Sequence, residues 1–215
     1  MRTALRFLAL VALLVAAPLL AQDDARLAIV LPEGSARGTE APAITTANVL
    51  EDRSLRELLH SGFPARLHYR LELWAAGGLF DDLRRRAEWD VIVRYDPLQR
   101  RYSATRIEGD RATSLGSYAR LPDMEKAVGK PFQPALQPPG RHDRFYYVAE
   151  LDVEMLSVND LDEVERWLRG ELSPAVRGER NPGTALGRGA KTLVTRLLGG
   201  EERHYQARSR VFRAP

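Results

Sequence analysis

Three acidic residues that alternate with apolar residues are the first candidates for chemistry in this chain. Glu150, Asp152 and Glu154 would project from one face of a β-strand at intervals of about 6.6–7 Å. Carboxylates on an exposed face could bind Ca²⁺ if a loop supplied further oxygen ligands. The pattern favours a simpler interpretation, a solvated face on which arginines of neighbouring strands pair with the acids. The arginines expected to do so are Arg70, Arg94 and Arg106.

The histidines and hydroxyls show no spacing typical of catalysis. His60, His68, His142 and His204 are scattered, and neither H-x-H nor H-E-x-x-H occurs, so zinc is not expected. There is no cysteine and no G-x-S-x-G elbow. Ser61 follows His60, but His60 falls at a predicted helix end, where a charge or a carbonyl hydrogen bond explains it. The sequence therefore assigns no catalytic, metal-binding or cofactor-binding residue and predicts no cofactor.

A carboxylate pair for acid–base catalysis is the main enzymatic alternative. Such a pair must flank a bond at about 5–9.5 Å, which spacing in the sequence does not establish. Asp81 and Asp82 are as readily explained as a helix cap. A hydrolase would need a pocket that gathers Asp143, Glu150 or Asp82 with a histidine.

One segment resembles a phosphate-binding loop but departs from its pattern. Residues 187–192 (GRGAKT) end in Lys-Thr before a predicted helix. A P-loop has glycines where this chain has Ala190 and Ala185, and it follows a strand that is not expected here. We therefore expect no nucleotide site.

The N-terminus has the layout of a secretory signal peptide over residues 1–21. Arg2 and Arg6 precede an apolar run, Phe7–Ala17, and Ala21 offers a small residue before the cleavage point. Leu19 occupies a position where a smaller residue is preferred, which leaves an uncleaved membrane anchor as the alternative. The sequence predicts an exported protein of the periplasm or cell envelope.

Composition agrees with one exported domain over residues 22–215. The chain has 32 Lys and Arg against 29 Asp and Glu, and loss of Arg2 and Arg6 leaves it almost neutral. Nucleic acid is therefore not an expected partner. From Arg166 onward, eleven basic residues face four glutamates, so basic charge gathers at the C-terminal end. A solvated basic surface is the plain explanation, and contact with anionic lipid is the alternative.

Periodicity predicts a β-rich α+β fold. Leu67, Tyr69, Leu71 and Leu73 alternate with polar residues, as in a strand with one buried face. Expected strands cover residues 27–31, 67–74, 87–95, 101–107, 113–119, 145–155 and 203–213. Expected helices cover 52–60, 121–128, 159–169 and 191–198. Expected loops cover 32–46, 130–142 and 173–189. Short turns between strands indicate an antiparallel sheet or sandwich of about seven strands with three to four short helices.

Four segments of the chain occur in a distinctive order: Ser61–Pro64, Trp89–Tyr102 with its Tyr-Asp-Pro-Leu turn, Phe145–Leu156 and Arg208–Phe212. In this order and spacing they resemble an uncharacterised family of exported bacterial proteins, the domain of unknown function numbered 4390. The resemblance covers roughly residues 45–213, and the chain departs from the family at Asp160–Arg169 and in the Gly/Arg-rich loop that follows. It implies a periplasmic or secreted protein without assigned activity and hints at a link to a membrane sensor kinase.

Taken together, these patterns favour a non-enzymatic exported domain that binds a protein or another envelope component, with a membrane surface as a further candidate partner. A hydrolase with an unrecognised carboxylate site is the first alternative. The second is a carrier of apolar ligands in the interior of a curved sheet, with a cavity lined by Tyr69, Trp89 and Tyr147.

Overall fold

The computed structural model describes most of the chain between residues 25 and 214. The described ranges are 25–77, 80–139, 143–156 and 203–214. Several predicted segments lie outside these ranges: the signal peptide, the helices expected at 159–169 and 191–198, and the loop expected at 173–189. No helix within these ranges has the length and apolar character needed to span a membrane.

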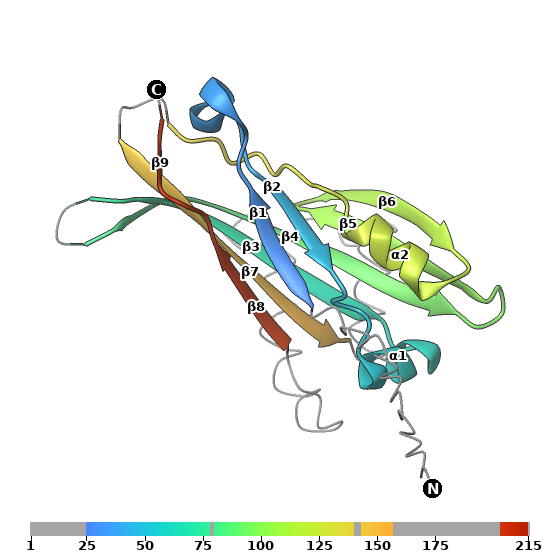
Figure 1. Cartoon of the computed structure of the whole chain (residues 1–215). Coiled ribbons are helices and arrows are strands. Elements are labelled where there is room, and N and C mark those ends of the chain that lie inside the picture. The colour runs from blue at the N-terminus through green and yellow to red at the C-terminus, as the bar shows by residue number, and fades with distance from the viewer. Residues whose placement is uncertain (1–24, 78–79, 140–142, 157–202, 215) are drawn as a thin grey trace, which may run out of the picture.

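A seven-stranded antiparallel sheet dominates the described structure (Figure 1). Its order is β6-β5-β4-β3-β7-β8, and β9 also pairs with β7. The strands are β3 (Ala65–Ala75), β4 (Asp82–Asp96), β5 (Arg101–Glu108), β6 (Arg111–Tyr118), β7 (Arg144–Met155), β8 (Arg203–Arg208) and β9 (Phe212–Arg213). The β-rich α+β class and the antiparallel sheet are therefore confirmed.

A second layer covers one face of this sheet. It contains β1 (Arg26–Val30) paired antiparallel with β2 (Ala43–Ala47), and the helix α2 (Leu121–Val128). Figure 1 shows β1 and β2 in front of the large sheet with α2 beside them. The other helix, α1 (Arg53–His60), lies at one end.

The covered face, called the inner face below, carries the core. Leu67, Leu71 and Leu73 of β3 have no exposed surface, and Tyr69 between them is 4% exposed. In β7 the same phase, from Phe145 to Val153, is buried as well. Each strand thus points its apolar phase inward, as the period-two pattern predicts.

Local signals place the ends of α1 as predicted. The Asp52 carboxylate caps the helix by accepting a hydrogen bond of 3.0 Å from the Leu55 N–H. Gly62 follows the helix at φ +92°, a backbone conformation that disfavours other residues, and Pro64 prevents continuation. The chain therefore enters β3 directly after α1.

Two sequence predictions need correction. The expected loop at 32–46 contains a 3₁₀ helix, η1 (Gly34–Gly38), and most of β2. The short Ala-Ile-Thr-Thr-Ala run of β2 is held in place by its pairing with β1. The last strand is divided into β8 and β9, because Ser209 exchanges hydrogen bonds of 2.9 Å with the Tyr147 backbone through both its N–H and its hydroxyl. Two of the expected helices are confirmed as α1 and α2, and the other two fall outside the described residues; the described strands form the large sheet and a two-stranded layer.

Candidate functional site

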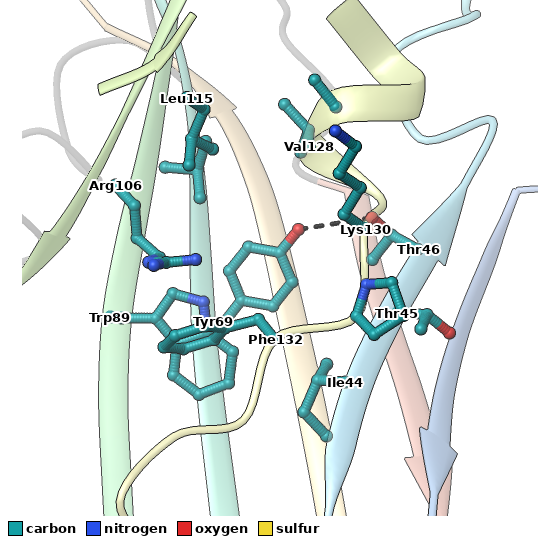
Figure 2. Close-up of a pocket in the computed structure, with 13 residues that line it drawn as sticks. Ile44, Thr45, Thr46, Tyr69, Trp89, Arg106, Leu115, Val128, Lys130 and Phe132 are labelled. Carbon is teal, nitrogen blue, oxygen red and sulfur yellow. Dashed lines mark hydrogen bonds between the residues drawn. The ribbon is translucent and has the colours of Figure 1, made fainter. Parts of the chain in front are cut away.

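A cavity of about 300 Å³ lies between the inner face of the large sheet and the covering layer. It is lined by residues of β2, β3, β4, β5, β6 and α2, and by the segment 130–132 that follows α2. Figure 2 shows these side chains converging on one space. The volume is at the lower end of the range for small-molecule sites, about 300–1,000 Å³.

Stacked aromatic rings form one wall. Tyr69 of β3 lies directly opposite Trp89 of β4 in the strand register, and their rings stack at 5.0 Å with planes 6° apart. Phe132 meets the Trp89 ring edge-on at 5.1 Å. Offset and edge-to-face contacts of this kind hold rings in fixed orientations. The wall is therefore rigid, apolar and flat.

The Tyr69 hydroxyl brings a polar atom to this wall. It lies 3.5 Å from the Thr46 hydroxyl of β2, the hydrogen bond drawn in Figure 2. Burial raises the pKa of Tyr69 to about 12, so the group stays neutral at physiological pH. It can donate or accept a hydrogen bond toward the cavity.

Arg106 of β5 brings a positive charge to the same space. It lies opposite Val91 and therefore points to the inner face, which corrects the prediction that it crosses the acidic face. Its guanidinium carbon lies 3.8 Å from the centre of the Phe132 ring, and its Nε donates to Glu108 at 2.9 Å. Its side chain is only 22% exposed.

The opposite wall depends on a close approach between α2 and β2. A Cβ on Gly129, directly after α2, would lie 2.2 Å from the Thr46 carbonyl oxygen, so no other residue fits without a backbone shift. Phe132 and Ile44 then exchange backbone hydrogen bonds of 2.8 and 3.0 Å. These contacts fix Phe132 against the sheet and leave the intervening Lys130 exposed at the rim.

A buried carboxylate lies behind this wall. Glu125 of α2 is 6% exposed, and its Oε1 accepts a hydrogen bond of 3.1 Å from the Leu50 N–H. Its Oε2 has no hydrogen-bond partner. Burial, reinforced by Glu51, raises the pKa of Glu125, while the Leu50 N–H works in the opposite direction. The group ties α2 to the turn that enters α1.

The three alternating acids lie on the opposite, outer face, and each meets an arginine or histidine of a neighbouring strand. Glu150 accepts from Arg70 at 2.7 Å, Asp152 pairs with His204 at 2.6 Å, and Glu154 accepts from Arg66 at 2.9 Å. The predicted pairing with Arg70 is thus confirmed. Ion pairs between neighbouring strands explain these acids without a bound metal.

The outer face also holds a buried ion pair that the sequence analysis does not predict. Arg66 is 2% exposed, and its guanidinium binds both Asp90 oxygens, at 2.9 and 3.1 Å. His68 approaches the same carboxylate at 2.8 Å. Burial alone would raise the pKa of Asp90, but the hydrogen bond from His68 and the charge and hydrogen bonds of Arg66 lower it below its ordinary range.

The other candidate residues are not brought together. The His60 ring shares a hydrogen bond with the Tyr102 hydroxyl and packs edge-on against Tyr95, whereas the Ser61 hydroxyl donates to the Glu57 carbonyl at 2.9 Å. Hence His60 and Ser61 do not form a nucleophile–base pair.

The remaining candidate acids do not gather at the cavity either. Asp81 accepts from the Tyr146 hydroxyl at 2.8 Å, and Asp82 pairs with Arg84 at 3.2 Å. Asp143 is not part of the cavity lining. Within the described ranges, no three histidines or acids form a group that could hold a metal ion. His142 and the segment 187–192 lie outside those ranges.

The fold and site together define a β-rich domain with a small aromatic cavity. No protein-family model, no curated protein and no solved structure matches this chain. The resemblance to the exported family therefore stays a prediction from the sequence.

Proposed function

We propose that the protein is an exported, non-enzymatic domain that binds a small envelope molecule with a flat apolar part in this cavity. The observation that carries the proposal is the stacked pair of Tyr69 and Trp89 facing an open volume of about 300 Å³. An aromatic wall of this kind favours ligands that present a flat apolar surface. Export is supported by the N-terminal pattern alone.

The composition of the lining supports binding rather than hydrolysis at this place. The described residues around the cavity contribute hydroxyls, aromatic rings and two cations, but no carboxylate or imidazole. Imidazole and carboxylate groups are the commonest general acids and bases, and of the other groups with this use the described lining offers the Tyr69 hydroxyl and the Lys130 amine. The carrier alternative gains support from Tyr69 and Trp89. Tyr147, the third residue expected there, instead lies in the core, where its hydroxyl donates to the Leu136 carbonyl.

Calorimetric titration tests the proposal with three bicyclic probes of matched shape: naphthalene-2-carboxylate, 2-naphthalenemethanol and 2-naphthylmethylamine. The protein is purified after expression of the full-length chain. We expect at least one probe to bind with one-to-one stoichiometry. A failure of all three to bind would contradict the proposed function.

A variant with a larger side chain in the cavity tests whether the probes bind there. Leu115 of β6 lines the cavity, and Leu115→Trp should fill part of it and weaken binding. The matched control is Leu98→Trp, because Leu98 is 94% exposed in the turn between β4 and β5. Equal binding by both variants would show that the probes bind elsewhere and would also contradict the proposal.

A further inference from the structure

The guanidinium of Arg106 has one edge left for a ligand. Its face is covered by Phe132 at 3.8 Å, and its Nε is used by Glu108 at 2.9 Å. No residue in the described ranges accepts a hydrogen bond from its two terminal nitrogens. Figure 2 shows the guanidinium extending from β5 toward Tyr69 and the cavity. The free edge therefore faces the space in which a ligand would lie.

A cation in this position is unusual for the inner face. Tyr102 and Ala104, which precede Arg106 in the same phase of β5, are buried apolar core residues. A guanidinium that is 22% exposed has lost much of its hydration and gains from an anionic partner. Glu108 compensates for it only from the Nε side and is itself 38% exposed. A second anion at the free edge would complete the hydrogen bonding.

Two further groups favour an anion. Lys130 lines the cavity from the covering layer, across from Arg106 (Figure 2), and adds positive charge at the rim. The Tyr69 hydroxyl is neutral and can donate a hydrogen bond. The described lining has no negative side chain, and the Glu108 carboxylate contacts Arg106 from its Nε side.

From this arrangement, and resting on the proposed binding function, we infer that the ligand is a carboxylate on a flat apolar body. Its carboxylate would lie in the plane of the guanidinium and accept two parallel hydrogen bonds from the terminal nitrogens, a geometry that fits planar carboxylates. Its apolar body would lie against Tyr69 and Trp89. Arg106 would thus be the residue that determines the charge class of the ligand.

The same three probes test this inference through their relative affinities. Naphthalene-2-carboxylate should bind more tightly than its neutral and cationic counterparts. Arg106→Met keeps an apolar stem over Phe132 and removes the charge, so it should weaken carboxylate binding on the order of 10- to 100-fold, the range for a charge-assisted hydrogen-bonded contact. Arg106→Met should leave binding of the alcohol nearly unchanged.

Two variants serve as controls. Arg106→Lys retains the charge without the planar fork and should give an intermediate affinity for the carboxylate. Arg101→Met removes an arginine from the same strand whose guanidinium binds the Ser117 hydroxyl and carbonyl, away from the cavity lining, and should have no effect. Thermal unfolding of each variant confirms that it is folded.

The outcomes separate the inference from the proposed function. If the wild-type protein binds the alcohol or the amine as tightly as the carboxylate, the inference is wrong and the binding function stands. The wild-type comparison decides this even if the Arg106 variants do not fold. Equal weakening of carboxylate and alcohol by Arg106→Met would also overturn the inference, because it would indicate a packing role alone. If no probe binds, both proposals fail.

Discussion

Replacing Glu125 by glutamine should stabilise the protein, and the gain should grow with pH. Glu125 is buried, and only one of its carboxylate oxygens has a hydrogen-bond partner. Glutamine keeps an oxygen that can accept from the Leu50 N–H at the same place. The substitution therefore removes mainly the buried charge.

The sign of the pH dependence follows from the direction of the pKa shift. Burial raises the pKa of Glu125 above its ordinary value of 4.5, so the unfolded chain loses this proton at lower pH than the folded protein. The protonated form supports full stability below the unfolded pKa. That stability is lost as the pH rises through the folded pKa, because ionisation then favours the unfolded chain. Asp52 and Asp90, whose pKa values are lowered, contribute in the opposite sense and below this window.

The magnitude is set by the cost of a buried charge with an unsatisfied oxygen. A buried polar group without a partner costs about 1–3 kcal/mol, and a charged one more. The neighbours modify this cost: Glu51 disfavours the charge, whereas Arg56 and the Leu50 and Val49 N–H groups favour it. We therefore expect Glu125→Gln to raise the free energy of unfolding by about 1–3 kcal/mol at pH above the folded pKa. Near the unfolded pKa the gain should vanish.

Urea unfolding of wild type and variant from about pH 4.5 to about pH 9 measures this difference directly. Glu33→Gln is a suitable control, because Glu33 is an exposed carboxylate before η1 and its removal should not change the pH profile. Glu125→Ala should lose stability at every pH, since the Leu50 N–H then has no acceptor. A Glu125→Gln variant that is destabilised by the same amount at all pH values would refute the reasoning.

Three further outcomes are expected. Arg66→Met removes the guanidinium that binds the buried Asp90 carboxylate, so denaturant unfolding should show a loss of about 3–5 kcal/mol. A loss below about 1 kcal/mol would contradict the view that this buried ion pair supports the fold. Gly129→Ala should lower the free energy of unfolding by about 1–3 kcal/mol in a thermal or urea assay, because the new Cβ would clash with the Thr46 carbonyl. An unchanged free energy of unfolding would show that α2 can move aside freely. Mass spectrometry of the protein from an envelope fraction should find Gln22 at the N-terminus if the signal is cleaved, whereas an intact Met1 would indicate an anchor.

The sequence predicted the main sheet well because period-two alternation is a local property. Each apolar phase assigned to residues 67–74, 87–95 and 145–155 is the inner phase of β3, β4 and β7. The ends of α1 followed from a capping carboxylate and a glycine, which act over four residues or fewer. β2 was missed because five residues rich in threonine carry little pattern and depend on β1 for their pairing.

The cavity could not be predicted in the same way, because its walls come from segments far apart in the chain. The sequence predicts Tyr69 and Trp89 as lining residues, and both lie on the aromatic wall of the cavity. Phe132 lies in a proline-rich segment whose position depends on a two-residue bridge to Ile44. Arg106 did leave a signal that sequence reasoning did not use: it is a cation in the apolar phase of a strand, following Tyr102 and Ala104.

The contrast between the arginines of the two faces shows why position rather than residue type gives Arg106 its role. On the outer face, β4 and β7 flank β3. Arg70 lies opposite Glu88 and Glu150 in register, and Arg66 lies opposite Glu154. Asp90 lies opposite His68 and binds Arg66 from two residues along the strand. These guanidinium groups pair with carboxylates of the neighbouring strands and stabilise the register of three strands. Arg106 lies on the inner face opposite Val91, where the neighbouring strand offers an apolar side chain. Its only carboxylate partner in the described structure is Glu108 of the same strand, which binds one of its three nitrogens. Because the strand alternation places Arg106 among apolar residues, its other two nitrogens can still donate hydrogen bonds to a ligand.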